Sequence, residues 1–335
     1  MDALNFLFLD SFYEFFNPKK RIFVGYIITA IIIASLWLIF FRKKNLRESI
    51  KKIFDKTILF SKSAKSDYIL FFLNQIIMSV LSPLLITQLA IATAIFYYLH
   101  SVSWLDAGIL DNTPVVLIVS LFTIFHFILE DFSKYIVHRL MHKWPVLWAL
   151  HKVHHSATCL TPMTVFRTHP LEGVIFSIRG SLTQAISISL FVFFFGSNVD
   201  IATILGANIF IFAFNVAGSN LRHSHIDISY WKWLERLIIS PAQHQVHHSA
   251  LKQHHDKNFG VALAIWDWIF GSLHHSERID GLTLGINLNQ KEESHKLFNL
   301  YIDPIKEIFF IISKNTNKLI SALKSLKFKS IGANR

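Results

Sequence analysis

The sequence predicts an all-α, polytopic membrane protein with about four to five transmembrane helices and a cytoplasmic helical cap that carries clustered histidines. The first observation is composition: 52% of the 335 residues are hydrophobic, only 16% are charged, and the mean hydropathy is +0.42. A soluble domain of this length would carry more charge. The other observations are a series of long uncharged runs and the gathering of the 18 histidines in polar segments beside them. The apolar excess therefore indicates burial in a bilayer.

Five uncharged runs are candidate membrane spans, because a helix needs about 20 apolar residues to cross a bilayer. They cover residues 22–41, 68–99, 113–129, 180–199 and 201–221. Pro83 interrupts the second run, which is either one kinked span, the interpretation we prefer, or two half-spans. The polar turn Gly196-Ser197-Asn198 separates the last two runs, so we expect them to form a tight helical hairpin.

The distribution of Lys and Arg sets the expected orientation, since short cytoplasmic loops carry an excess of both. The loop at 42–67 is dense in Lys and Arg and is placed in the cytoplasm, whereas the loop at 100–112 contains neither. The third run then returns to the cytoplasm near Glu130, and everything after residue 221 lies there too. All the histidine clusters are therefore expected on one side of the membrane.

Three regions are expected along the chain: an N-terminal membrane region (1–112), a catalytic domain (113–285) and a basic tail (286–335). Within the tail, Lys recurs among apolar residues from 305 to 328, which predicts an amphipathic helix at the membrane surface. The chain has a net charge of +11, and its basic residues flank the apolar runs. This arrangement favours anionic lipid headgroups over nucleic acid as the partner. The single Cys159 excludes an internal disulfide and a cysteine-ligated metal cluster.

Three histidine clusters are the strongest functional signal. They are His138 and His142, then His151, His154 and His155, and finally His244, His247 and His248. Positions i, i+3 and i+4 share one face of a helix, so each cluster can aim its imidazoles at one point. Chance predicts about 0.05 copies of His-x-x-His-His, and the chain has two. The pattern favours a metal site over histidines that only contact lipid headgroups at the membrane interface. Binding of haem by two histidines would instead place single histidines on facing spans, so the clusters do not favour it.

Eight imidazoles exceed the three or four ligands of one zinc ion and fit two ions with open positions. Neutral imidazole favours Fe, Cu or Zn over Mg or Ca. An all-histidine set without a phosphate-binding motif favours redox or oxygen chemistry. The alternative of another class is a metal-binding membrane protein without catalysis, such as a transporter or a scaffold. A transporter would carry ionisable residues at mid-membrane, and the candidate spans hold few besides His126 and Arg179.

The strings around the clusters carry a family resemblance. They are Glu130-Asp131-Phe132 before His138-Arg139, Trp148 to Ser156, Phe166-Arg167-Thr168-His169-Pro170, Ser240-Pro241-Ala242-Gln243-His244, Asp256-Lys257-Asn258-Phe259-Gly260 and Trp266-Asp267. With the three clusters, they resemble the histidine boxes of the fatty acid hydroxylase/sterol desaturase superfamily. The resemblance runs from about residue 115 to 285, about half of the chain.

The resemblance implies an integral membrane enzyme that binds two iron ions, with zinc in their place in purified material, and uses O₂. The eight box histidines and His223 are the implied ligands, and His225, which replaces an asparagine of the family, is a further candidate. Residues that would orient the ligands through hydrogen bonds are Asp131, His169 and Asp256, and also His254 and His255. We expect His274 and His275 to be surface residues.

The expected activity is hydroxylation of a C–H bond in a lipid, such as a fatty acyl chain or a sterol. Desaturation or ether-lipid cleavage by the same kind of site is the alternative. The lipid is expected to enter from the bilayer between the spans. No cytochrome b5 or flavin domain is visible, so a separate electron donor of the cytochrome b5, ferredoxin or reductase type is expected. A bacterial inner membrane, with the site facing the cytoplasm, is preferred to the endoplasmic reticulum.

Overall fold

The computed structural model describes residues 13–332 except 83–84, 86, 197–198, 200–207, 279–281 and 288–294, and it describes side chains up to residue 316. In this part of the chain the structure is helical and contains no strand, only two isolated bridges, which confirms the predicted all-α class. The α-helices are α2 (Val24–Phe40), α3 (Leu46–Ile53), α4 (Lys56–Leu59), α5 (Lys62–Leu81), α6 (Gln88–Ser101), α7 (Val115–Lys143), α8 (Pro145–His155), α9 (Pro170–Phe195), α11 (Ile209–Val216), α12 (Pro241–His247), α13 (Ile265–Ile269) and α14 (Leu297–Gly332). The short 3₁₀ helices are η1 (Glu14–Phe16), η3 (Pro162–Phe166), η5 (Ser219–His223), η6 (Leu234–Arg236) and η7 (Lys252–His254).

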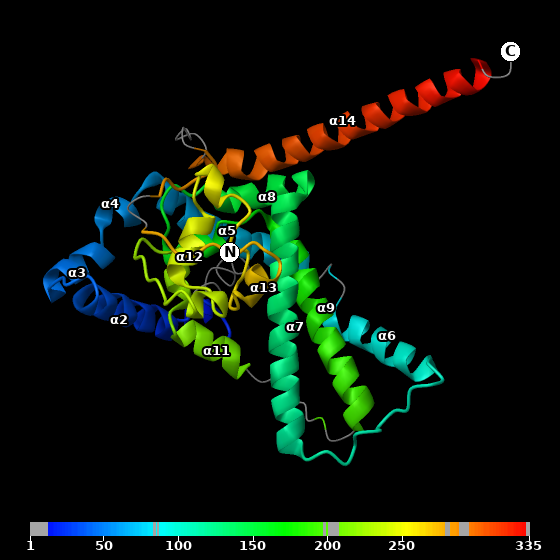
Figure 1. The fold of residues 1–335 in the computed structure, drawn as a ribbon, viewed down its shortest axis with the longest axis horizontal. Helices are drawn as coiled ribbons and strands as arrows, with labels where there is room; N and C mark the ends of the chain where they lie inside the picture. Colours follow the sequence, from blue (N-terminus) through cyan, green and yellow to red (C-terminus); the bar gives the residue numbers. More distant parts are fainter. Residues whose placement is uncertain are drawn as a thin grey trace, which may run out of the picture.

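Helices α6, α7 and α9 form a stalk that extends from the rest of the molecule, which we call the head (Figure 1). Pro114 precedes α7 and Pro170 occupies the first turn of α9, where a proline costs no helical hydrogen bond. Both α7 and α9 are long and apolar enough to cross a membrane. At 29 residues, α7 is roughly 43 Å long. It therefore runs through the whole stalk and carries its last turns into the head.

The packing of the stalk changes from apolar to polar along its length. Far from the head, Phe122 of α7 packs edge-to-face on Phe191 of α9 with ring centroids 5.1 Å apart. Nearer the head, Arg179 of α9 donates to both carboxylate oxygens of Glu130 on α7, at 2.7 and 2.9 Å. Thr183 donates to the same carboxylate at 2.8 Å. Because each of these polar groups has a partner, the pair can lie between apolar surfaces without leaving a bare charge.

Two of the expected spans differ in the structure. The 68–99 run forms two helices, α5 and α6, and not the single continuous kinked span that we prefer from the sequence. The 201–221 run, whose residues 201–207 lie outside the described part, contains only the eight-residue α11 and the start of η5. Gly218 separates these two elements at φ +90°, a conformation that other residues rarely adopt. The described part of this run is therefore not a span.

Helix α2 lies along one side of the head and has two distinct faces (Figure 1). Its buried face repeats every fourth residue and consists of Tyr26, Ala30, Ala34 and Leu38. The small alanines pack against Leu221, Ile226 and Ile228, in the segment that carries η5. Its other face is apolar and exposed. With 17 residues α2 is shorter than the 22–41 span that the sequence predicts.

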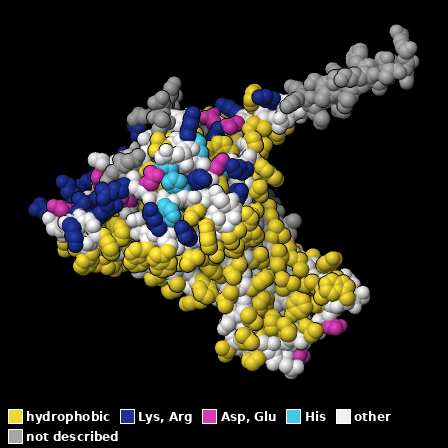
Figure 2. Space-filling model, viewed as in Figure 1, with side chains coloured by type: hydrophobic (Ala, Val, Ile, Leu, Met, Phe, Trp, Pro, Cys, Tyr) yellow, Lys and Arg dark blue, Asp and Glu magenta, His cyan; other side chains and the backbone are white. Residues whose placement is uncertain are grey.

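Apolar and basic side chains occupy different parts of the surface (Figure 2). Hydrophobic side chains cover the stalk and continue along the side of the head where α2 lies. Lysines and arginines gather at the end of the head near α3 and α4. This division is the one expected of a protein whose stalk is in a bilayer and whose head faces water and lipid headgroups.

The basic tail forms a helix, as the sequence predicts. Leu300 of α14 packs against Val153 of α8 and Leu70 of α5, so the start of the tail is part of the head. From there α14 extends away from the molecule (Figure 1). Its first turns therefore hold the back of α8, the helix that carries the second histidine cluster.

Candidate metal centre

Four elements from distant parts of the chain bring the histidines together in the head. His138 and His142 lie on the last turns of α7, one helical turn apart. Pro145 begins α8 directly after α7 ends, so the chain turns and the second cluster on α8 faces the first. The remaining histidines lie on η5 and on α12 with its C-terminal cap.

Local sequence explains why α12 starts where it does. Ser240 accepts a hydrogen bond from the backbone of Gln243, and the Gln243 side chain accepts one in return from the Ser240 backbone. Pro241 occupies the first turn, where its missing N–H has no cost. This capping box begins the helix immediately before the third cluster and fixes its orientation.

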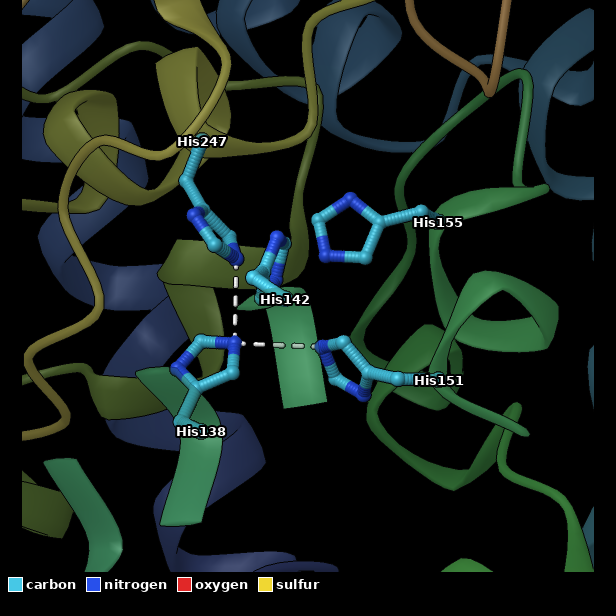
Figure 3. Close-up of side chains that lie close together, drawn as sticks. All are labelled: His138, His142, His151, His155 and His247. Carbon is cyan, nitrogen blue, oxygen red and sulfur yellow. Dashed lines mark hydrogen bonds between the residues drawn. The ribbon is translucent and has the colours of Figure 1, made fainter. Parts of the chain in front are cut away.

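Nine histidines form two adjoining groups, and within each group the potential ligand nitrogens lie within 4.8 Å of one another. The first group contains five residues and is drawn in Figure 3: His138, His142, His151, His155 and His247. The second contains four: His154, His223, His244 and His248. The stacked rings of His155 and His248, with centroids 4.6 Å apart, join the two groups. The structure therefore brings together all eight box histidines and His223.

The five-histidine group presents lone pairs to a common centre. Nε2 of His138 lies 3.1 Å from Nε2 of His151 and 3.0 Å from Nε2 of His247, the two contacts dashed in Figure 3. Nδ1 of His138 donates to the carbonyl of Phe259 at 2.8 Å, and Nδ1 of His247 donates to that of Lys257 at 2.6 Å. A neutral ring that donates from Nδ1 keeps an unprotonated Nε2. Lone pairs facing each other at this distance repel unless a cation lies between them.

The four-histidine group has the same arrangement. Nε2 of His223 lies 3.1 Å from Nε2 of His154 and 2.9 Å from Nε2 of His244. Metal–nitrogen bonds of about 2.0–2.1 Å place neighbouring ligand atoms roughly 3 Å apart. Both nitrogens of His248 are buried without a hydrogen-bond partner among the described residues. Such bare nitrogens are expected of rings that bind an ion, so the two groups fit two metal ions.

Burial keeps these rings neutral. The pKa of His151 and that of His154 are each lowered to about 3, and burial is the main cause for both. Burial, reinforced by the neighbouring imidazoles, also lowers the pKa of His155 and of His248. A neutral imidazole is the form that binds a metal, so the site is ready to accept cations at neutral pH.

Glu172, which sequence reasoning missed, is the one carboxylate in direct contact with a box histidine among the described residues. Its Oε1 accepts from Nδ1 of His151 at 2.8 Å, and both side chains are buried. Its Oε2 is buried without a described partner. Carboxylates that hold the far nitrogen of a histidine fix the ring and raise its basicity toward a metal. The single acidic residue of α9, in its first turn, was the available signal.

Asp131, His169 and Asp256, which the sequence also predicts for the site, contact groups around the histidine rings and not the rings themselves. Asp131 accepts from the backbones of Ala262 and Leu263 and from the indole of Trp266, so it holds the loop that follows Phe259.

His169 caps α9 through the backbone of Leu171 and contacts the carbonyl of Tyr301. Asp256 pairs with Lys143 at the surface. The structure thus places Asp131, His169 and Asp256 around the site, and none of them touches a box imidazole by a described hydrogen bond.

Four of the remaining histidines lie in three different environments. His225 lies outside both groups, and its Nε2 is 2.7 Å from the carbonyl of Lys52. His255 is exposed. His254 is fully buried and His274 partly buried, and they approach each other with ring centroids 5.1 Å apart. The side chain of His274 is 29% exposed, so it lies at the surface as expected and also contacts this buried ring.

Comparison with known proteins confirms the resemblance seen in the sequence. Residues 123–272 match the fatty acid hydroxylase family model. The ornithine lipid hydroxylase OlsE of Rhizobium tropici is 26% identical over 159 residues, which are 48% of this chain and 44% of that protein. Alkylglycerol monooxygenase of Homo sapiens is 29% identical over 175 residues, 51% of this chain and 36% of that protein.

A sterol enzyme shares the same region. The Delta(7)-sterol 5(6)-desaturase ERG3B of Gibberella zeae is 26% identical over 144 residues, 43% of this chain and 40% of that protein. The chain thus spans less than half the length of each of these curated relatives. No solved structure matches it.

Proposed function

Residues 123–272 are a domain of the fatty acid hydroxylase/sterol desaturase superfamily, and from that premise we propose that the chain is a membrane-bound, O₂-dependent oxidoreductase that hydroxylates a C–H bond of a lipid. The observation that carries the proposal is the pair of adjoining histidine groups, five and four rings, buried together at the end of α7. The proposed cofactor is two iron ions, one for each group. When bound, the ions would supply the reduction and activation of O₂.

The protein's own contribution is to hold nine neutral rings in fixed orientations. Backbone carbonyls of Phe259 and Lys257 and the carboxylate of Glu172 accept from the Nδ1 atoms of three rings, which leaves the Nε2 atoms free for the ions. Because these acceptors come from two segments distant in sequence, the loop at 257–259 and α9, the ring positions depend on the folded head. The all-nitrogen donor set favours Fe, Cu or Zn, and an oxygen-dependent reaction selects a redox-active metal.

The lipid would reach the site from the apolar side of the molecule. A cavity of about 260 Å³ lies between α7 and α13 and is lined only by apolar residues: Phe125, Ile128, Leu129, Phe132 and Trp266. The Trp266 indole donates to Asp131, which also holds the backbone two residues after Gly260. Trp266 at this cavity is thus linked through Asp131 to the backbone that follows Phe259, whose carbonyl accepts from His138. It supports entry of a hydrocarbon chain beside α7.

The electron donor and the orientation are also part of the proposal. We propose a separate donor protein that meets the head in the cytoplasm. The basic surface near α3 supports this assignment, because Lys and Arg mark cytoplasmic segments. The start of the basic helix α14 lies on the same head.

The test is mass spectrometry of total lipids from cells that lack the gene and express either the wild-type chain or a variant. His151→Ala removes one ring of the five-histidine group, and His255→Ala, at an exposed position, is the matched control. A lipid that gains one oxygen atom with the wild type and with His255→Ala, and not with His151→Ala, supports hydroxylation. Loss of two hydrogens or a cleaved ether would contradict hydroxylation, but it would still support an O₂-dependent oxidoreductase that acts on a lipid. If the wild type changes no lipid, the proposal that the chain is a lipid-modifying enzyme is overturned.

A further inference from the structure

A third group of metal-ligating side chains lies outside the two box groups. It consists of His254 on η7 and His274 and Glu277 in the segment that follows α13, and one ligand atom of each lies within 4.8 Å of the others. Nε2 of His254 is 3.2 Å and Nε2 of His274 is 3.7 Å from the same oxygen, Oε1 of Glu277. None of these residues belongs to the nine described above. The group therefore has to be explained separately.

The tautomer of His274 makes its Nε2 a ligand. Nδ1 of His274 donates to the carbonyl of His275 at 2.8 Å. A neutral ring that donates from Nδ1 carries a lone pair on Nε2. That nitrogen lies 3.7 Å from Oε1 of Glu277. An imidazole nitrogen and a carboxylate oxygen at this separation are both zinc ligands and can bind one cation between them.

His254 brings a second nitrogen to the same place from an enclosed position. Its side chain is fully buried, and its Nε2 lies 3.2 Å from the side-chain nitrogen of Gln253, an amide donor. The same Nε2 lies 3.2 Å from Oε1 of Glu277. An imidazole nitrogen carries one proton or one lone pair, so Nε2 either accepts from Gln253 or donates to Glu277, and a cation would take the place of that partner. Its Nδ1 is buried without a partner among the described residues. A buried imidazole normally has both nitrogens engaged, so the ring is poorly satisfied by protein contacts alone.

The backbone that carries His274 and Glu277 is held in place by hydrogen bonds to the rest of the head. The backbone N–H of His274 donates to Oδ1 of Asn258 at 2.7 Å, and its carbonyl accepts from the Gln243 side chain at 3.2 Å. The backbone N–H of Ser276 donates to the buried carboxylate of Glu235 at 3.1 Å. Both flanks of the segment are thus fixed, and its ligands point toward His254. Such preorganisation lowers the cost of binding an ion.

We propose that His254, His274 and Glu277 form a third metal site, distinct from the paired site, that binds one Zn²⁺. Two imidazoles and one carboxylate match the ligands of zinc, with water in the remaining position. Glu277 is 40% exposed and His254 fully buried, so the ion would enter from solvent and lie against a buried ring.

The position of this third site gives it a structural consequence. Asn258, which receives the N–H of His274, also donates to the carbonyl of Gln243 at 3.0 Å. Gln243 immediately precedes His244, a member of the four-histidine group. An ion bound by His254 and His274 would therefore brace α12 from outside, and this bracing is independent of whether the paired site is catalytic.

The experiment is metal analysis of the purified full-length chain loaded with Zn²⁺ and dialysed, for the wild type and three variants. Glu277→Gln removes the charge and keeps the shape, and His274→Gln removes the partly buried ring. His255→Gln is the matched control, because it makes the same change one residue after His254 at an exposed position. We expect one equivalent of zinc fewer per chain in Glu277→Gln and in His274→Gln than in the wild type, and no loss in His255→Gln.

The outcomes separate this site from the paired one. Retention of the box ions in Glu277→Gln shows that the variant is folded, and the loss of a single equivalent then supports the third site. If the wild type and both site variants bind equal zinc, the three side chains are only hydrogen-bonded and the inference is overturned. If the box groups hold no ion at all, the difference of one equivalent is still measurable, so failure of the proposed function is distinguishable.

Discussion

The carboxylate of Glu172 lies 2.8 Å from Nδ1 of His151, and each side chain is less than 5% exposed. The two residues belong to different helices, α9 and α8, so the contact ties the start of an apolar stalk helix to the five-histidine group. A carboxylate in this position fixes the ring and strengthens its remaining nitrogen as a ligand. It is also the contact that sequence reasoning did not provide.

Replacing Glu172 should weaken the site without removing a ligand. We expect Glu172→Ala to lower metal affinity or activity by about 10–100-fold, because Nδ1 of His151 loses its acceptor. Glu172→Gln, whose amide oxygen can still accept, should lose less. Metal retention during dialysis against a chelator and turnover of the lipid substrate measure the effect. If both variants keep wild-type retention and turnover, Glu172 does not position His151.

The two histidine groups should lose their ions separately. His244→Ala removes a ring of the four-histidine group, and His142→Ala removes one of the five-histidine group. Because the groups share no ligand, each variant should retain about one of the two box ions. Metal analysis with the third site disabled by Glu277→Gln counts them directly. Loss of both ions in each variant would show instead that the groups bind as one unit.

His223 and His225 are two residues apart and should behave differently. Nε2 of His223 points at His154 and His244, whereas Nε2 of His225 contacts the carbonyl of Lys52. We expect His223→Ala to release the ion of the four-histidine group and abolish activity. His225→Ala should keep both box ions and stay within a few-fold of wild-type activity. An ion lost from His225→Ala would restore the ligand role that the sequence had suggested for it.

The metal-free protein should be sensitive to acid. In the folded state the pKa values of His151 and His154 are lowered from 6.5 to about 3 by burial, so both rings stay neutral there. The unfolded chain takes up protons on these rings below pH 6.5 and the folded one does not until about pH 3. The stability they contribute is therefore fully present above pH 6.5 and declines as the pH falls through this window.

Thermal unfolding in detergent with a chelator, between pH 7.5 and 4.5, tests this expectation. The Tm of the wild type should fall with pH, and the slope should be smaller in His154→Phe, which keeps an aromatic ring and removes one titrating group. A pH-independent Tm, or equal slopes in both proteins, would contradict the assignment of burial as the cause.

The sequence was sufficient for the features that depend on local pattern. Long apolar runs predicted α7 and α9. The i, i+4 pair of each cluster does lie in one group, as helical spacing predicts. The expectation that a whole cluster aims at one point is wrong, because His154 and His247 each belong to the other group. The resemblance added His223, which is 21 residues from His244 in the chain and 2.9 Å from it through Nε2. These conclusions hold because helical periodicity and the choice of ligand side chains depend on residues that are close together in the sequence.

Only the tertiary structure could decide which histidines share an ion. His154 and His155 are adjacent in sequence, yet they belong to different groups, because successive residues on α8 point in directions about 100° apart and face different partners. The roles of Glu172, His254, His274 and Glu277 also depend on segments that meet only after folding. The sequence by itself determined a helical, apolar chain with clustered histidines as candidate metal ligands. The packing of α7, α8, η5 and α12 decided how those ligands divide, since a coordination site is a set of distances across the fold and not a spacing along the chain.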